Sequence, residues 1–97
     1  MKKLGLNNLF DCYSELLTEN ERKCFIDYYS EDLSLSEIAT NNNVSRSAVG
    51  KTIKTVEEKL NIYEKLLNIH GTKIKLKEIS DLNDIDKIKD EIQKIID

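Results

Sequence analysis

Three cations, Arg46, Lys51 and Lys54, are the only charged groups of residues 45–56. A guanidinium group donates paired hydrogen bonds to guanine edges or to phosphate, and ammonium groups bind phosphate as point charges. On a helix that begins at Arg46, these cations would face outward near the N-terminus, where a DNA-reading helix enters the groove. The pattern predicts a nucleic-acid-binding surface, and an ordinary solvated helix face is the alternative.

Other chemistry in the sequence is sparse. His70 is the sole histidine, and no nucleophile, carboxylate or metal-ligand set stands at a meaningful spacing from it. Cys12 and Cys24 lack a CxxC spacing and partner histidines, so we interpret both as small core residues. The sequence contains no glycine-rich phosphate loop. We therefore expect no enzyme activity, no cofactor and no bound metal.

Presenting the three cations requires a helix, a tight turn and a second helix. Ala39, Asn43 and Val49 have the offsets 0, +4 and +10 of a helix-turn-helix, with Asn43 as the left-handed turn residue. The junction between the helices is expected to be filled by Ile38, Val44 and Ile53. The outward residues of the second helix form the predicted site: Ser45, Arg46, Ser47, Gly50, Lys51 and Lys54.

Local signals predict where the helices begin. An amphipathic pattern over residues 8–17 indicates a first helix. The pair Thr18 and Glu21 has capping-box spacing, which starts a second helix near residue 19, and the same spacing recurs before a short helix that ends near residue 42. Ser45 is expected to cap a long helix, which has no breaker until Gly71.

The second half of the chain carries two apolar stripes. The stripe of the long helix has the 4, 3, 4, 3, 4 spacing of a coiled-coil seam: Val49, Ile53, Val56, Leu60, Tyr63 and Leu67. Residues 73–77 alternate, so a strand and a helical turn both fit, and we favour a helix. A last helix has a stripe from Leu82 to Ile96, with Asp81 and Asn83 as candidate N-caps. We expect this tail to pack on the long helix, within the chain or across a homodimer.

The composition agrees with an all-α fold. The 97 residues suffice for one small core, and they include no proline and three glycines. No apolar stretch has the length of a membrane span or of a signal peptide. We therefore expect a cytoplasmic protein that does not enter the membrane. Its predicted parts are a helix-turn-helix domain over residues 1–71 and a C-terminal helical extension over residues 72–97.

Charge is distributed unevenly along the chain, whose net charge is −3. Residues 1–33 hold four basic and seven acidic groups, a net charge of −3, and residues 61–97 hold seven and eight, a net charge of −1. Residues 34–60 hold four and three, a net charge of +1. Because neutralised phosphates supply most non-specific affinity, three outward cations predict weak binding by a single copy. Tight binding would need a homodimer, which doubles the number of phosphate contacts, or a partner protein.

Residues 9–67 resemble the YlxM-type family of small bacterial helix-turn-helix proteins. The motifs that carry the resemblance are "LLTENER", "DYYSEDLSLSEIA" and "VSRSAV", followed by the long helix with "YEKLL". The resemblance implies a fold similar to region 4 of sigma factors, with a long recognition helix and a helical tail. It also implies an association with the signal recognition particle.

Two functions follow from the residues and the resemblance together. The first is a non-enzymatic regulator whose helix-turn-helix binds nucleic acid, DNA or RNA, in the signal recognition particle pathway. The second is an interaction module that binds the particle's GTPase through its acidic first third and does not bind nucleic acid.

Overall fold

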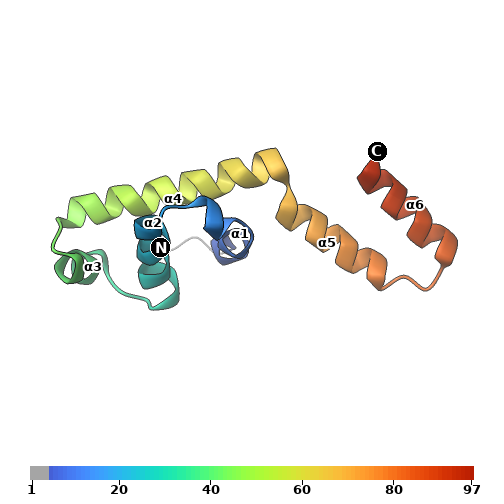
Figure 1. The fold of residues 1–97 in the computed structure, drawn as a ribbon. Coiled ribbons are helices and arrows are strands. Elements are labelled where there is room, and N and C mark those ends of the chain that lie inside the picture. The colour runs from blue at the N-terminus through green and yellow to red at the C-terminus, as the bar shows by residue number, and fades with distance from the viewer. Residues whose placement is uncertain (1–4) are drawn as a thin grey trace.

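The structure is a computed structural model that describes residues 5–97, and the regular elements in this range are all helical (Figure 1). The α-helices are α1 (Leu6–Tyr13), α2 (Glu19–Phe25), α3 (Leu35–Asn42), α4 (Arg46–Leu67), α5 (Ile69–Ser80) and α6 (Ile85–Ile96). A 3-10 turn, η1 (Ser14–Leu16), follows α1, and a π-helical segment, η2 (Ile26–Ser30), continues α2. The predicted all-α fold is confirmed, and residues 73–77 are helical within α5.

The helix starts are set by the predicted side-chain caps. Thr18 Oγ1 accepts a hydrogen bond from the Glu21 N–H (3.1 Å), and the Glu21 carboxylate accepts one from the Thr18 N–H (2.8 Å). Ser34 and Glu37 form the same reciprocal box at α3. Each box satisfies two backbone donors that a helix N-terminus would otherwise leave free. Both predicted capping boxes are confirmed.

The first predicted helix differs from the observed one at both ends. Helix α1 begins at Leu6, two residues before the predicted start, and its α-helical part ends at Tyr13. The chain then tightens into η1, where the Leu17 N–H donates to the Ser14 carbonyl (3.1 Å). The tighter turn ends at Leu17, whose extended backbone and buried side chain lead into the Thr18 cap.

Helices α1, α2 and α3 pack against one side of α4, which is the axis of the N-terminal part of the molecule (Figure 1). One buried cluster joins α1 and α2 to the middle of α4: Leu6, Tyr13, Leu17, Phe25, Val56 and Leu60. A second cluster joins α2 and α3 to its first turns: Cys24, Ile38, Ala39, Val49 and Ile53. Four residues of the predicted coiled-coil seam are thus covered by their own chain, while Tyr63 is half-buried and Leu67 exposed.

The two cysteines lie in or beside these clusters. Cys24 is buried in the second cluster, and its burial raises the pKa of the thiol. Cys12 is half-buried and packs against the first cluster. A buried thiol with a raised pKa is mostly protonated, and hence unreactive, near neutral pH. The prediction of a small core residue is confirmed for Cys24, whereas Cys12 lies at the edge of the core.

Helix α4 ends at Leu67, and the prediction that it continues to Gly71 is wrong. Asn68 adopts the left-handed conformation (φ 51°, ψ 37°), which breaks the helix and begins α5 in a new direction (Figure 1). Gly71 lies in the first turn of α5, where a Cβ would stand 2.2 Å from Asn68 Oδ1. The missing side chain of Gly71 therefore leaves room for the side chain of Asn68.

A carboxylate from α4 caps the start of α5. Glu64 accepts hydrogen bonds from the backbone N–H groups of His70 (3.1 Å) and Gly71 (3.0 Å), and from the hydroxyl of Tyr13. That hydroxyl in turn accepts from the Ile69 N–H (2.9 Å). Burial raises the pKa of Glu64, but these hydrogen bonds outweigh it and leave the pKa below its ordinary value. The joint between α4 and α5 is thus held by an ionised carboxylate and tied to α1.

Helices α5 and α6 form a hairpin that extends away from α1, α2 and α3 (Figure 1). The N-cap of α6 is Asp84, whose carboxylate accepts from the N–H groups of Asp86 (2.9 Å) and Lys87 (3.3 Å), so the predicted caps Asp81 and Asn83 are wrong. Helix α6 packs on α5 rather than along α4. Packing across a dimer and the division at residue 71 remain predictions. None of the helices in residues 5–97 is both long and apolar enough to span a membrane.

Candidate nucleic-acid interface

The turn between α3 and α4 has the predicted geometry. Asn43 is left-handed (φ 55°, ψ 45°), and its N–H donates to the Thr40 carbonyl (3.3 Å). Ala39 and Val49 are both buried where the two helices meet. Val44 departs from the prediction, because its side chain is 50% exposed instead of filling the junction. Val44 instead lies beside Ala39 and Asn43 at the edge of a shallow hollow on the surface.

Ser45 begins α4 as predicted. Its Oγ accepts a hydrogen bond from the Ala48 N–H (3.0 Å), which satisfies a donor in the first turn. The first turn of α4 contains no acidic residue, so the positive end of the helix dipole adds to the charge of Arg46. The structure leaves Ser45, Arg46 and Ser47 exposed. This end of α4 is therefore open to an anionic ligand.

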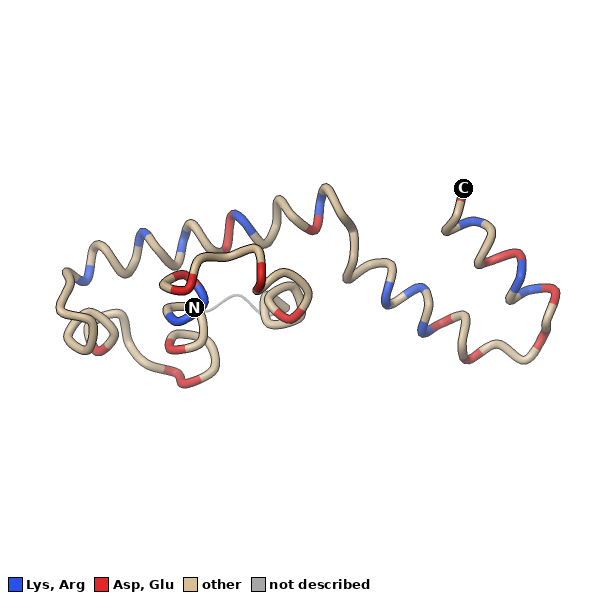
Figure 2. The backbone as a smooth tube through the Cα atoms, viewed as in Figure 1, with Lys and Arg blue, Asp and Glu red and all other residues tan. Residues whose placement is uncertain are grey.

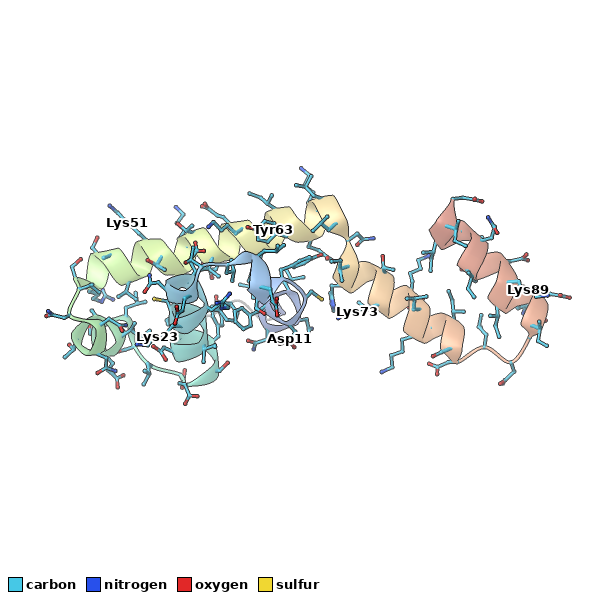
Figure 3. All side chains as sticks on the ribbon, in the orientation of Figure 1. Asp11, Lys23, Lys51, Tyr63, Lys73 and Lys89 are labelled. Carbon is cyan, nitrogen blue, oxygen red and sulfur yellow. The ribbon has the colours of Figure 1, made fainter. Side chains whose placement is uncertain are left out.

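The two lysines lie farther along the exposed side of α4. Lys51 points away from α1, α2 and α3 in Figure 3, and both Lys51 and Lys54 are exposed. Within residues 5–97, neither lysine nor Arg46 has an ion-pair partner. Figure 2 shows basic residues spaced along the half of α4 next to α3. None of the three cations is therefore held in an ion pair within the part of the chain that the structure describes.

Gly50 differs from the other predicted site residues, because it faces α3. A Cβ built at Gly50 would have one neighbour, Leu35 Cδ1 at 3.9 Å, which is ordinary van der Waals contact. Gly50 is half-buried, whereas the remaining five site residues are exposed. The structure therefore places Gly50 at the edge of the helix contact and the other five together on the outer surface.

Lys59, the fourth cation of residues 34–60, has a different environment. Its ammonium group lies 2.7 Å from a carboxylate oxygen of Glu21, whose side chain is 10% exposed. Burial raises the pKa of Glu21, but hydrogen bonds from Lys59 and from the Thr18 N–H outweigh it and lower the pKa below its ordinary value. The same contact raises the pKa of Lys59. Lys59 therefore stabilises the domain and contributes little to an external ligand.

Acidic residues mark the end of the basic surface. Glu57 accepts a hydrogen bond from the Tyr29 hydroxyl, and Glu58 is exposed one turn beyond Lys54. A phosphate chain following α4 would meet like charge at Glu58, so the usable surface spans about residues 45–55.

Sequence reasoning missed the contribution of α3. Ser36 and Thr40 of α3, Asn43 of the turn and Arg46 of α4 line a shallow hollow beside the predicted site. Hydroxyl and amide groups are frequent phosphate ligands in DNA complexes. The signal was present in the sequence, because Ser36 and Thr40 are four residues apart and so share one helix face.

Titratable side chains do not gather into a metal site within residues 5–97. No three or more His, Cys, Asp or Glu side chains converge there in a way that could hold a metal ion. The backbone N–H of His70 donates a hydrogen bond to the Glu64 carboxylate. The imidazole ring of His70 has no hydrogen-bond partner within residues 5–97. The arrangement offers a polar and basic surface for binding.

Comparison with known proteins agrees with this geometry. All of residues 1–97 match UPF0122, a family described as "Putative helix-turn-helix protein, YlxM / p13 like". The chain belongs to this family. The resemblance seen in the sequence motifs is thereby confirmed, together with the helix-turn-helix.

Several UPF0122 relatives match over most of their length. One from Malacoplasma penetrans is 43% identical over 95 residues, which cover 91% of this chain and 89% of the relative. One from Fusobacterium nucleatum is 43% identical over 97 residues, covering 93% and 87%. One from Oceanobacillus iheyensis is 41% identical over 100 residues, covering 99% and 95%. The UPF0122 likeness therefore includes the α5–α6 hairpin as well as the helix-turn-helix.

Proposed function

We propose that this UPF0122 protein is a non-enzymatic cytoplasmic regulator that binds nucleic acid, DNA or RNA, through the exposed N-terminal half of α4. The observation that carries the proposal is the unpaired trio Arg46, Lys51 and Lys54 on an outer helix surface that contains no carboxylate. Ser45 and Ser47 add hydroxyl donors beside the trio. A recognition helix uses this N-terminal part for base and phosphate contacts.

The charges limit the strength of such binding. Each phosphate contact releases about 0.9 counterions, so three contacts give a slope of log K against log salt of about −2.7 for one copy. A homodimer that places two helices on one duplex doubles this slope to about −5. We propose that the functional form carries two such helices, because one copy would bind too weakly to compete at physiological salt.

A role in the signal recognition particle pathway is part of the proposal, and it rests on the resemblance to YlxM-type proteins. A second candidate function is docking on the particle's GTPase. It is favoured by the acidic residues of the first third of the chain, of which five are exposed: Asp11, Glu15, Glu19, Glu31 and Asp32. Those carboxylates would attract a basic protein surface and repel nucleic acid.

The test is a titration of three proteins with duplex DNA and with particle RNA at two salt concentrations. The proteins are the wild type, the triple variant Arg46→Ala/Lys51→Ala/Lys54→Ala, and a control that removes the same number of exposed cations elsewhere, Lys23→Ala/Lys65→Ala/Lys89→Ala. We expect the first triple variant to lose binding, with helicity by circular dichroism unchanged because exposed helical positions accept alanine. The control variant should keep most of its affinity.

Equal losses in the two triple variants would mean that binding follows net charge alone, which contradicts the proposal. Unchanged affinity in the α4 variant would contradict it as well. Binding of the particle's GTPase that persists in the α4 variant, with no nucleic-acid binding by the wild type, would favour the second candidate.

A further inference from the structure

The α5–α6 hairpin lacks a core of its own. Of residues 69–97 only Ile79 is buried, and α6 has no buried residue. The apolar side chains of α6 nevertheless form one stripe, because Ile85, Ile88, Ile92 and Ile96 follow at spacings of three and four. An amphipathic helix gains most of its stability from covering such a stripe.

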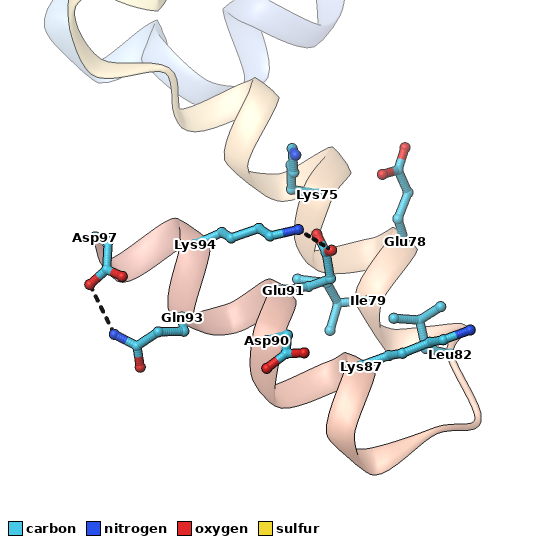
Figure 4. A pocket seen from close by; sticks show the side chains of 10 residues that line it. All are labelled: Lys75, Glu78, Ile79, Leu82, Lys87, Asp90, Glu91, Gln93, Lys94 and Asp97. Atoms are coloured by element: carbon cyan, nitrogen blue, oxygen red, sulfur yellow. Dashed lines mark hydrogen bonds and ion pairs between the residues drawn. The ribbon is translucent and has the colours of Figure 1, made fainter.

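A groove of about 550 Å³ runs between α5 and α6 (Figure 4). Its apolar residues are Ile79 and Leu82, and both signs of charge lie along its rim. The basic groups are Lys75, Lys87 and Lys94, and the acidic groups are Glu78, Asp90, Glu91 and Asp97. Lys94 already pairs with Glu91 at 3.0 Å. The α6 residues of the groove thus form the polar face of this helix, and the isoleucine stripe lies on the opposite face, outside the groove.

We propose that this hairpin is the dimer interface, and that a second copy of the same hairpin covers the isoleucine stripe of α6. A two-fold interface sets a surface against itself, so a patch of one sign would repel its copy, whereas a patch of both signs can pair. Helix α5 holds three lysines and one glutamate, a net charge of +2, and residues 81–97 hold three basic and six acidic groups, a net charge of −3. Each α5 therefore complements the α6 side of the second hairpin.

The other kinds of occupant fit the charges less well. Residues 81–97 have a net charge of −3 and would repel phosphate, so nucleic acid and anionic lipid are poor ligands for the stripe of α6. A strongly acidic or strongly basic protein would meet like charge on one of the two helices. Two amphipathic hairpins that bury their stripes together give a four-helix bundle, which is a stable arrangement for helices of this length.

A dimer formed through this interface supplies the second α4 helix that the proposed function requires, and to that extent the inference rests on that function. The dimer formed through the hairpins leaves the cationic end of α4 free in both copies, because that end lies at the opposite end of the elongated molecule (Figure 1). The two recognition helices of a dimer would then face one ligand from two separate positions.

Sedimentation equilibrium of the full chain tests the interface, with the variant Ile92→Glu/Ile96→Glu and a matched control, Ile62→Glu/Leu66→Glu. Both pairs are exposed, lie four residues apart on a helix and add the same charge. We expect the wild type to dimerise with a dissociation constant on the order of micromolar. The α6 pair should raise that constant about tenfold or more, since it places four carboxylates in the interface, and the α4 pair should change it less than about twofold.

A wild type that stays monomeric at about 100 µM, or an equal loss in the α4 control, would overturn the interface. If circular dichroism shows that the α6 Glu pair loses helicity, Ile92→Ala/Ile96→Ala decides instead, with an expected rise in the dimer dissociation constant of about threefold or more.

DNA binding separates this inference from the proposed function. The Ile92→Glu/Ile96→Glu variant should keep binding that depends on Arg46, with about half the wild-type salt slope. A dimer that does not bind nucleic acid would contradict the function alone.

Discussion

The apolar stripes of α4 and α6 have similar helical spacing but opposite surroundings. Those residues of the α4 stripe that meet the other helices are at most 5% exposed: Val49, Ile53, Val56 and Leu60. On α6, by contrast, Ile85 and Ile96 are 68% and 70% exposed. Each stripe predicts that its helix packs against another element. Whether that element belongs to the same chain or to another molecule depends on the rest of the fold. A seam that suggests a coiled coil can instead be the wall of the protein's own core.

The ion pairs of the two regions differ in the same way. Glu21 and Lys59 meet where the Glu21 side chain is largely shielded from water, whereas Glu91 and Lys94 meet on an open helix surface. A shielded carboxylate has lost hydration that its partner must replace, while an exposed one keeps its water. The two pairs, at 2.7 Å and 3.0 Å, therefore contribute unequally to stability mainly because their exposure differs. Three pairs of substitutions would sharpen this comparison.

The largest contrast is expected for Leu60→Ala against Ile85→Ala. Leu60 is fully buried, so its truncation should lower the free energy of unfolding by about 2–5 kcal/mol through lost burial and the cavity left behind. Ile85→Ala should change it by less than about 0.5 kcal/mol in the monomer. Urea unfolding of both variants can be followed by tyrosine fluorescence. All four tyrosines precede α5, so the signal reports the unfolding of helices α1 to α4. Similar losses would mean that the hairpin and the domain unfold as one unit.

A smaller contrast is expected between Lys59→Ala and Lys94→Ala. Losing Lys59 leaves the Glu21 carboxylate shielded without its ion partner, which should cost about 1–3 kcal/mol. Losing Lys94 removes an exposed i,i+3 pair and should cost about 0.5 kcal/mol or less. Thermal unfolding at pH 7 compares the two variants. Equal costs would show that the shielding of Glu21 has no energetic consequence.

Acid should act through the same group. The folded-state pKa of Glu21 lies below its ordinary value, so this contribution to stability is present above the unfolded pKa, near 4.3, and is lost as pH falls through the folded pKa. The wild type should therefore lose stability more steeply than Lys59→Ala below about pH 4.3.

The smallest contrast concerns two glycines. Gly50→Ala should raise the free energy of unfolding by about 0.5–1 kcal/mol, because the new methyl group meets only Leu35 at an ordinary contact distance. Gly71→Ala should not show this gain, because its Cβ would collide with the side chain of Asn68. Nucleic-acid affinity should be unchanged in Gly50→Ala if Gly50 serves packing alone. A loss of affinity there would return Gly50 to the binding surface.

The features predicted correctly from the sequence are set by short-range chemistry. The caps at Thr18, Ser34 and Ser45 depend on hydrogen bonds that span three residues, and Asn43 depends on the tolerance of its own backbone. Such interactions form wherever the chain becomes helical, so spacing alone reveals them. The same locality explains why the predicted face of Arg46, Lys51 and Lys54 is exposed in the structure.

The errors concern features that depend on distant residues. Asn68 has the same backbone tolerance as Asn43, but its bend also depends on Glu64 and on the hydroxyl of Tyr13, which is 51 residues away from Glu64 along the chain. Gly71 appeared to be the breaker because glycine commonly ends helices. The exposure of Val44 and the partner of the α4 stripe likewise depend on how α3 crosses α4, which periodicity does not specify.

The joint at Asn68 acts as the pivot of a lever. Helix α4 has 22 residues and so extends about 33 Å from the joint to Arg46 at 1.5 Å per residue. A change of about 10° at the pivot moves the far end by about 6 Å, close to two base-pair steps of 3.4 Å. In the proposed dimer, the distance between the two cationic ends of α4 therefore depends on how rigidly Glu64 holds the angle between α4 and α5. If the joint were more flexible by a few degrees, the cationic end of each α4 would reach different phosphates at different times, even with every contact residue intact.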